Sequence, residues 1–287
     1  MSKFFTDTDC ELWYEDVDKY NINLLKMPYH IGDQDGYYDM GRTTKYLDFI
    51  KEMRAGAMPT TSALNPSEYI DYFEPVLKSG EDILYVHFSN KMSGTFNYMN
   101  LAIEELKEKY PDRKITLFDT KSICFGAGFQ VLEAAKMHAS GASDEEIVAF
   151  LEEFTKHACI NFAVESLTYL KKGGRISPAV AVVGGLLNIK PILRFNNEGE
   201  IVKVGNVNGM KRAVMSMIDT MASNITGDYP VYVCDADNKD MREFAISYIK
   251  QKMGEDTKIV TYPIGPVICA HCGPGTVGII YYGKERK

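Results

Sequence analysis

The sequence predicts an α/β protein of two domains, the first with a mostly parallel sheet and the second with an antiparallel element. Its 287 residues exceed the roughly 100–200 residues of a typical single domain. In the first half, strand-like apolar runs alternate with helical patterns, which is typical of parallel strands joined through covering helices. In the second half, a polar turn between two apolar runs predicts a hairpin. We place the boundary near residue 157, which gives domains of residues 1–157 and 158–287.

Helices and strands alternate along the first domain. Each expected helix has apolar residues at helical spacing, and glycine or proline ends several of them. Ser67 is the expected N-cap of the second helix, and Ser143 with Glu146 predicts a capping box at the last one. The expected helices cover residues 43–56, 65–80, about 94–110, about 125–140 and 144–156, and the expected strands cover 83–88 and 114–119.

The second domain begins with the strand-like run INFAVES and the loop-like run KKGGRIS. A hairpin is expected next, because the runs IKPILRF and IVKVGNV flank the turn NNEGE. The remaining expected elements are helices over residues 211–225 and 241–254, and strands over 229–237, 258–265 and 276–283.

Composition and charge exclude several classes of protein. A formal net charge of −7 disfavours nucleic-acid binding, which normally needs a basic face. No apolar run approaches the ~20 residues that cross a bilayer, and the amino-terminus lacks the apolar core of a signal peptide, so we expect a cytoplasmic protein without stable membrane insertion. Six scattered cysteines predict reduced thiols, and the pair in CAHC, Cys269 and Cys272, lacks the second pair of a structural zinc site.

Four loops rich in glycine, serine or threonine lie where a strand ends or a helix begins. In open α/β sheets such loops converge on one ligand crevice. The Walker A pattern is absent from the sequence. The dinucleotide fingerprint G-x-G-x-x-G is absent too, because FGAGFQV carries Val131 where the third glycine would stand. The loops are PTTSALNPS (59–67), NKMSGT (90–95), KGGRIS (172–177) and HCGPGTVG (271–278).

The hydroxyls in these loops can donate hydrogen bonds to an anionic head group, and a helix start after Gly94 adds backbone N–H groups. Each hydroxyl can equally be an ordinary cap or turn residue. A third interpretation makes Ser93 the nucleophile of an esterase or acyl-transfer enzyme with His271 or His87 as base, although the segment lacks the G-x-S-x-G pattern. The hydroxyl residues are Thr61, Ser62, Ser93 and Thr95.

Six of the motifs resemble, in order and approximate spacing, those of the DegV family of fatty-acid-binding proteins. They are TTSALNPS, MSGTF, DTKSICFGAG, LKKGGRIS, LLNIKPIL and HCGPGTVG, and together they span nearly the whole chain. The resemblance implies a DegV-like two-domain α/β fold that buries one long-chain fatty acid in a tunnel. The carboxylate is then expected near the domain junction.

The resemblance also assigns site residues. Thr61 and Ser93 are expected to bind the carboxylate, with His271 beside it and Ser62, Gly94 and Thr95 in the same loops. Arg175 lies either near the pocket mouth or in a solvated tight turn. No catalytic residue, cofactor or metal is implied. Some members of the family present the bound acid to a separate ATP-dependent kinase subunit, which makes the acyl phosphate, so the protein itself is expected not to be an enzyme.

Apolar segments are available to line a tunnel. The candidates ICFGAGFQVL (123–132) and VAVVGGLLNI (180–189) can equally be plain core. The sequence also departs from the family pattern, because Cys124 occupies a place often held by serine and TTSALNPS carries an apparent one-residue insertion. Gly205 or Asn206 stands where members commonly have an arginine, which puts the kinase partnership in question. Asp7 is expected to hold a loop near the head group.

Overall fold

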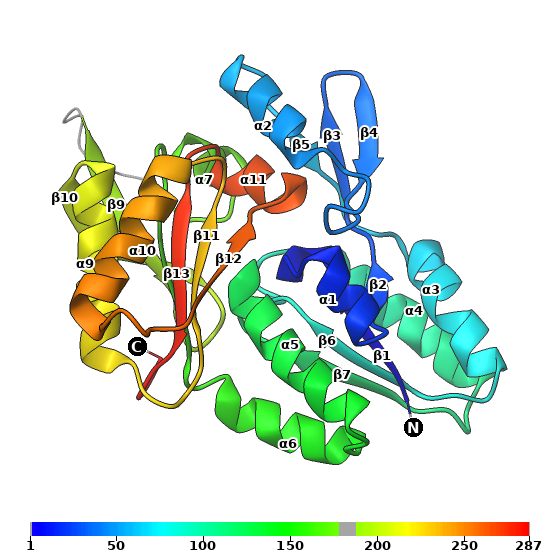
Figure 1. Ribbon diagram of the computed structural model, residues 1–287. Helices are drawn as coiled ribbons and strands as arrows, with labels where there is room; N and C mark the ends of the chain where they lie inside the picture. The colour runs from blue at the N-terminus through cyan, green and yellow to red at the C-terminus, as the bar shows by residue number, and fades with distance from the viewer. Residues whose placement is uncertain (1, 178–187, 287) are drawn as a thin grey trace.

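The computed structural model describes residues 2–177 and 188–286. Two α/β halves lie side by side, and each has its own main sheet (Figure 1). All strands of the first main sheet precede residue 120, and all strands of the second follow residue 157. This arrangement is compatible with a boundary near residue 157, which stays a prediction.

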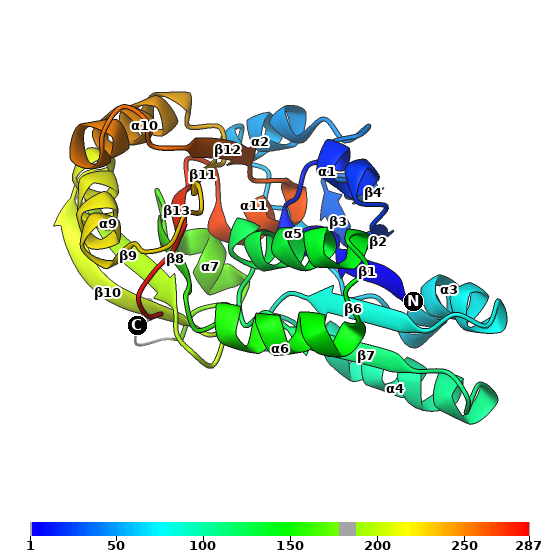
Figure 2. The same cartoon turned by 60° about the horizontal axis from the view of Figure 1, so that its bottom comes forward.

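The first main sheet has four strands in the order β2-β1-β6-β7, and every neighbouring pair is parallel. The predicted mostly parallel sheet is therefore confirmed. Helices α3 and α4 cover one face and α5 and α6 the other (Figures 1 and 2), so β6 is buried on both faces. The elements are β1 Lys3–Asp7, β2 Asn23–Leu25, β6 Ile83–His87, β7 Ile115–Asp119, α3 Pro66–Lys78, α4 Thr95–Lys109, α5 Phe125–Ala139 and α6 Asp144–Phe154.

A small antiparallel sheet of order β4-β3-β5 stands above this half and was not predicted. It matters for the site because its short strand β5 carries Thr61. The surrounding elements are η1 Thr8–Cys10, α1 Tyr14–Lys19, β3 Pro28–Ile31, β4 Gln34–Tyr37, α2 Tyr46–Arg54 and β5 Thr60–Thr61.

The second main sheet has six strands in the order β10-β9-β8-β13-β11-β12. Only β11 and β12 pair in parallel, and the predicted hairpin is the antiparallel pair of β9 and β10. Helices α9 and α10 pack on the outer face, and the other face looks toward the first half (Figure 1). The elements are β8 Ala158–Ala163, α7 Thr168–Lys172, β9 Ile189–Phe195, β10 Ile201–Asn208, α9 Met210–Asn224, β11 Val231–Asp235, α10 Lys239–Met253, β12 Ile259–Pro263, α11 Pro266–Cys272 and β13 Val277–Tyr282.

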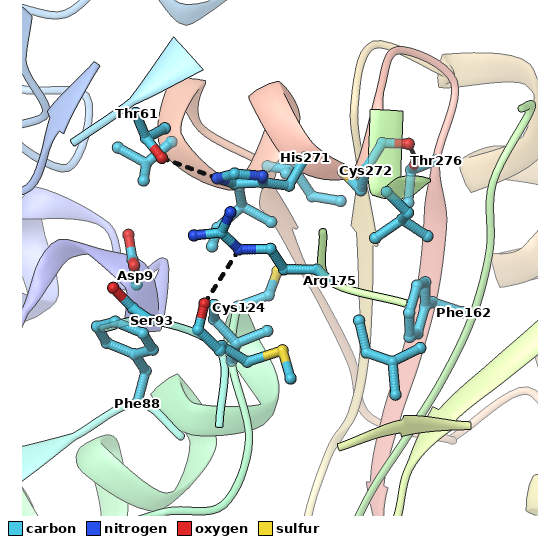
Figure 3. Close-up of a pocket in the computed structure, with 18 of the residues that line it drawn as sticks. Asp9, Thr61, Phe88, Ser93, Cys124, Phe162, Arg175, His271, Cys272 and Thr276 are labelled. Carbon is cyan, nitrogen blue, oxygen red and sulfur yellow. Dashed lines mark hydrogen bonds between the residues drawn. The ribbon is translucent and has the colours of Figure 1, made fainter. Parts of the chain in front are cut away.

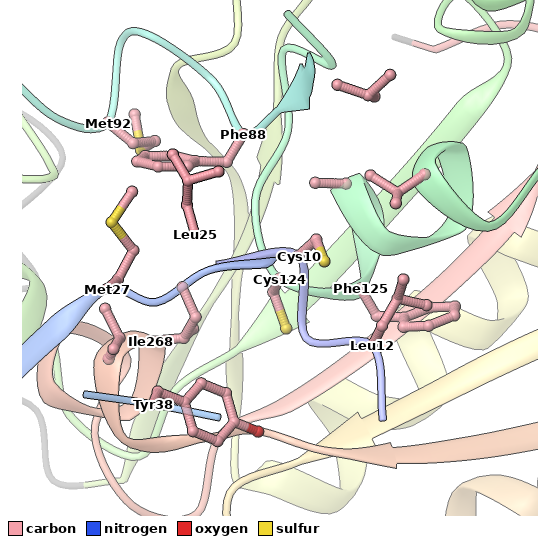
Figure 4. Close-up of a cluster of buried hydrophobic side chains, with 14 of the residues drawn as sticks. Cys10, Leu12, Leu25, Met27, Tyr38, Phe88, Met92, Cys124, Phe125 and Ile268 are labelled. Atoms are coloured by element: carbon pink, nitrogen blue, oxygen red, sulfur yellow. The ribbon is translucent and has the colours of Figure 1, made fainter. Parts of the chain in front are cut away.

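The hydrophobic core is continuous across the junction of the two halves. Figure 4 shows Ile268 of α11 close to Met27 and Tyr38 of the first half. Phe125, the first residue of α5, stacks on Tyr262 with ring centroids 3.9 Å apart. The two halves are therefore held together by buried apolar contact rather than by a bare linker.

Two local expectations are wrong, and both have a clear cause. Ser67 is not the N-cap of α3, because Asn65 accepts the N–H of Glu68 at 3.1 Å and Glu68 accepts the N–H of Asn65 at 2.8 Å. Pro66 then occupies the first helical position, which suits its fixed φ and missing N–H. The run KKGGRIS is not entirely a loop, since Lys171 and Lys172 end α7.

Candidate functional site

A cavity lies between the two halves, and residues from both line it. Its volume, measured as the space that the centre of a water molecule can occupy, is about 80 Å³. A single water needs roughly 10–15 Å³ on the same measure. Most of the lining is apolar. The lining residues are Asp9, Met27, Thr61, Ser62, Phe88, Met92, Ser93, Thr95, Ile123, Cys124, Ile160, Phe162, Leu170, Arg175, Phe195, Ile201, Cys234, Ile264, Val267, Ile268, His271, Cys272, Thr276 and Gly278.

The polar lining residues come from separate elements whose ends meet at the junction (Figure 3). Thr61 ends β5, and Ser93 lies in the loop between β6 and α4. Arg175 follows α7, and His271 lies in the last turn of α11. The four glycine-rich and hydroxyl-rich loops singled out in the sequence each contribute to the same cavity.

Two hydrogen bonds organise these polar groups. The Thr61 hydroxyl and His271 Nε2 are 2.8 Å apart, and Arg175 Nε donates to the Met92 carbonyl at 3.1 Å. Arg175 also donates through Nη1 to the carbonyl of Gly173. Arg175 is half-buried, lines the cavity and is directed into it.

His271 is neutral at physiological pH. Burial, and secondarily the neighbouring Arg175, lower the pKa of this imidazole to about 4. Its Nδ1 atom is buried and has no hydrogen-bond partner among the described residues. Gly173 packs so close that an added Cβ would lie 2.4 Å from Nδ1, so the glycine is required for this approach. Nε2 remains the polar contact of the ring with Thr61.

The four residues around the β6–α4 and β5–α3 loops differ in what their polar groups do. The Ser93 hydroxyl accepts the N–H of Thr95 at 3.2 Å and borders the cavity. Thr95 also borders it, but its hydroxyl is bonded to Tyr69 at 2.8 Å. Ser62 is an exposed lining residue, whereas Gly94 precedes α4 and does not line the cavity. The described residues include no hydrogen bond between Ser93 and His271.

Asp9 is a site residue that the sequence reasoning did not identify. It lines the cavity, and its Oδ1 atom is buried without a hydrogen-bond partner in the described part of the chain. Burial, followed by repulsion from Asp7, raises the pKa of Asp9 well above its usual value, which favours the protonated form of the carboxyl. The sequence signal that could have identified Asp9 is the acidic pair Asp7 and Asp9 at the end of the first strand.

Asp7 anchors the turn that carries Asp9. Its carboxyl accepts the N–H of Asp9 at 3.1 Å, the N–H of Phe88 at 3.2 Å and the hydroxyl of Tyr85 at 2.9 Å. Burial raises the pKa of Asp7 to about 7 in spite of these hydrogen bonds. Behind the same turn, Gly128 of α5 lies so close that an added Cβ would be 2.2 Å from the Cys10 carbonyl. The glycines of FGAG therefore serve helix packing.

The deep part of the cavity is apolar and contains several thiols. Ile123 and Cys124 from one predicted lining segment border it, while Phe125 and the following residues of α5 enter the core. The other predicted segment, residues 180–189, lies almost entirely outside the described residues. Cys269 and Cys272 are buried on α11. Within the described ranges, no group of three or more histidine, cysteine, aspartate or glutamate side chains could hold a metal ion.

Comparison with known proteins places the chain in a family. Its residues 2–284 match the family model described as an uncharacterised protein, DegV family. A DegV domain-containing protein of Clostridium perfringens is 34% identical, with 100% of each chain covered. The Thermotoga maritima DegV lipid-binding protein has a TM-score of 0.83 at 26% identity, with 100% of each chain covered.

A DegV family protein of Thermus thermophilus, whose structure is described as fatty acid binding, has a TM-score of 0.83 at 27% identity, covering 98% of this chain and 99% of that one. No helix within the described part of the chain is long and apolar enough to cross a membrane. The family match over nearly the full length, together with the shared fold, shows that this chain belongs to the DegV family.

Proposed function

We propose that this protein binds a single long-chain fatty acid in a tunnel formed by the cavity between its halves, with the carboxylate held by the hydroxyls of Thr61 and Ser93. One observation carries the proposal: polar groups from four separate loops line an otherwise apolar cavity between two packed halves. The descriptions of the Thermus and Thermotoga relatives as fatty acid and lipid binding support the same ligand class.

The apolar tail supplies most of the affinity. Burying an alkyl chain is worth about 0.8 kcal/mol per methylene, so about fifteen methylenes contribute on the order of 12 kcal/mol before the entropic costs of binding. Phe88, Ile160 and Phe162 provide apolar wall for this tail. The polar groups then set the orientation of the acid.

The head-group end combines one cation with neutral hydrogen-bond donors. Arg175 gives electrostatic attraction to a carboxylate, and the hydroxyls of Thr61 and Ser93 donate to its oxygens. The raised pKa of Asp9 favours the protonated carboxyl, which can donate a further hydrogen bond instead of repelling the ligand. The neutral His271 ring orients Thr61 through their hydrogen bond.

We propose further that the protein is not itself a catalyst but presents the acid to a separate ATP-dependent kinase subunit. This finer part depends on the family resemblance, and Gly205 or Asn206, just after a register shift in β10, stands in the place of the expected arginine. The esterase alternative would need Ser93 to be activated by a base, and the Nε2 atom of His271 is already bonded to Thr61.

Native mass spectrometry of the purified protein, followed by solvent extraction, tests the proposal. We expect one fatty acid per chain. Ser93→Ala and Thr61→Val should each weaken binding by about 1.5–3 kcal/mol, which is roughly 10- to 150-fold, because each loses a hydrogen bond to a charged group.

Ser67→Ala is the matched control, since Ser67 is exposed and its hydroxyl bonds to Asn65 outside the cavity. Folded protein that never carries or takes up a fatty acid would refute the proposal. Stoichiometric labelling of Ser93 by a serine-directed probe, with ester turnover lost in Ser93→Ala, would favour the enzyme instead.

A further inference from the structure

A second cavity lies on the outer side of the second half. It is bordered by the end of α9, by the chain after β13 and by residues of the neighbouring strands β8 and β9. Its volume on the same measure is about 290 Å³, far more than the roughly 10–15 Å³ that one water needs. Lys284 N donates to the Asn224 carbonyl at 2.8 Å, and Asn224 Nδ2 donates to the Glu285 carbonyl at 2.9 Å. These bonds fix the carboxyl-terminal segment against α9, as Figure 1 also shows.

This second cavity is cationic although the protein is acidic. Arg194, Lys284 and Arg286 line it, and Glu285 is its one acidic lining residue. The lining therefore carries a formal charge of +2, from three cations and one anion, in a chain whose formal net charge is −7. Such a concentration of positive charge in a hollow attracts anions.

Arg286 is buried without a carboxylate partner. Only 4% of its surface is exposed, and its Nη atoms donate to the backbone carbonyls of Thr120 and Lys121. Its Nε atom is buried and has no hydrogen-bond partner among residues 2–177 and 188–286. In the described ranges Arg286 forms no ion pair with an acid, and Asp119 and Glu198 act on it only at longer range. Burial lowers the pKa of Arg286 to about 10, so the guanidinium remains charged at neutral pH.

Arg194 supplies a second unsatisfied donor in the same hollow. It lies opposite Asn161 in the register of β8 and β9, and its Nε atom is also buried without a partner in the described structure. Both Arg194 and Asn161 line the cavity. A buried donor without an acceptor costs about 1–3 kcal/mol, so two guanidinium N–H groups at one hollow point to a ligand that brings its own acceptors.

We infer that this second cavity is a binding site for a small organic anion whose phosphoryl or carboxylate oxygens accept hydrogen bonds from Arg194 and Arg286. Guanidinium groups match the oxygens of either group in geometry and charge. Lys284 lies at the exposed rim, where it attracts the anion. Ile160 and Phe195 form an apolar part of the wall, which suits a ligand that has an organic body beside its charged group.

The two cavities are separate in chemistry but adjacent in space. Ile160 and Phe195 border both of them. The β8–β9 pairing covers only Asn161 to Ala163 against Ile192 to Arg194, so the strands are no longer paired where Ile160 and Phe195 lie. An anionic ligand at Arg194 therefore lies behind the apolar wall of the first cavity.

Isothermal titration of the full-length protein with phenyl phosphate, benzoate and inorganic phosphate, at constant ionic strength, tests the inference. We expect saturable one-to-one binding of at least one of them. Binding of phenyl phosphate alone identifies a phosphoryl group, and binding of benzoate alone identifies a carboxylate. Arg194→Gln and Arg286→Gln should each weaken that binding by roughly tenfold or more, because each loses a charge-assisted hydrogen bond.

Arg42→Gln is the matched control, because Arg42 is exposed and pairs with Asp18 in the other half. Arg194→Lys keeps the charge and should restore part of the affinity, which a purely structural role would not produce. Circular dichroism checks folding, and Arg194→Gln decides the matter if Arg286→Gln does not fold. The inference is overturned by an absence of saturable binding, by binding that survives Arg194→Gln, or by equal weakening in Arg42→Gln.

Discussion

Each cavity contains a buried basic side chain, and the two side chains differ in whether they stay charged. In the cavity between the halves, burial lowers the pKa of His271 to about 4, and the ring stays neutral. In the second cavity, burial also lowers the pKa of Arg286, but the value of about 10 leaves it charged. A group that can release its proton avoids the cost of desolvation, and one that cannot needs an anionic partner. This difference separates the proposed site for a mostly apolar molecule, whose carboxylate meets Arg175, from the proposed site for a small anion beside Arg194 and Arg286.

The strand between the cavities shows how one segment serves both. Successive residues of a strand point to opposite faces of the sheet. Along β8, Phe162 lines the cavity between the halves, Cys159 and Asn161 line the second cavity, and Ile160 borders both. A shift of one residue in register would exchange these sets, so the β8–β13 pairing fixes both chemistries together.

The largest expected effect comes from filling the cavity between the halves. Gly278 on β13 borders it, and a Cβ added there meets only ordinary contacts at 3.8–3.9 Å. Gly278→Phe should place a ring where the tail would lie and reduce fatty acid binding by more than about 100-fold, since several buried methylenes are displaced. Mass spectrometry of extracted lipid and competition with a fluorescent fatty acid measure the loss.

Gly278→Ala is the control for this substitution and should keep most of the affinity. Phenyl phosphate binding at Arg194 should be unchanged in Gly278→Phe if the two cavities are independent. Full lipid loading of correctly folded Gly278→Phe would contradict the assigned tail position.

A smaller effect is expected at Asp9. If the protonated carboxyl donates to the ligand, Asp9→Asn keeps a donor and should retain affinity within about threefold, whereas Asp9→Ala should lose roughly tenfold. In the native protein the affinity should fall as rising pH ionises Asp9, because a carboxylate would then face a carboxylate. Fatty acid titrations across pH measure this, and a decline of equal size in Asp9→Asn would show that Asp9 is not its cause.

The smallest effect concerns stability at acidic pH. The pKa of His271 is about 4 in the folded protein against a model-peptide value of 6.5, so the unfolded chain takes up a proton first as the pH falls. The free energy of unfolding should therefore decrease between pH 6.5 and 4. The His271→Gln variant should lack this decrease, which we place on the order of 1–2 kcal/mol.

Urea unfolding of both proteins at several pH values isolates the effect of His271, because all other titrating groups are shared. Parallel pH profiles would show that the imidazole is as easily protonated in the folded protein as in the unfolded chain.

Much of the fold could be predicted because the relevant signals are local. The capping box of Ser143 and Glu146 and the NNEGE turn both mark the elements that the structure contains. The short strand β1 was not predicted. Its apolar pair, Phe4 and Phe5, is followed closely by Asp7 and further acidic residues, so the run is too short to show a strand pattern. Helix α11 was not predicted because it has only seven residues, Pro266 to Cys272, fewer than helical periodicity needs.

The site was predictable only in part, for a physical reason. Hydroxyls such as Thr61 and Ser93 stand in recognisable loop motifs, so the sequence indicates their chemistry. Arg194 and Arg286 look like ordinary basic residues, and their meaning comes from burial without a carboxylate partner, which only the folded chain reveals. The same holds for Asp9, whose neighbours set its protonation.

Phe195 borders both cavities, and this position makes it a natural reporter. A single fluorine atom on its ring would sense either molecule through its resonance frequency, without any label on the ligands themselves. Four sample states, empty, lipid-loaded, anion-loaded and doubly loaded, would then reveal whether occupancy on one side of the sheet is felt on the other.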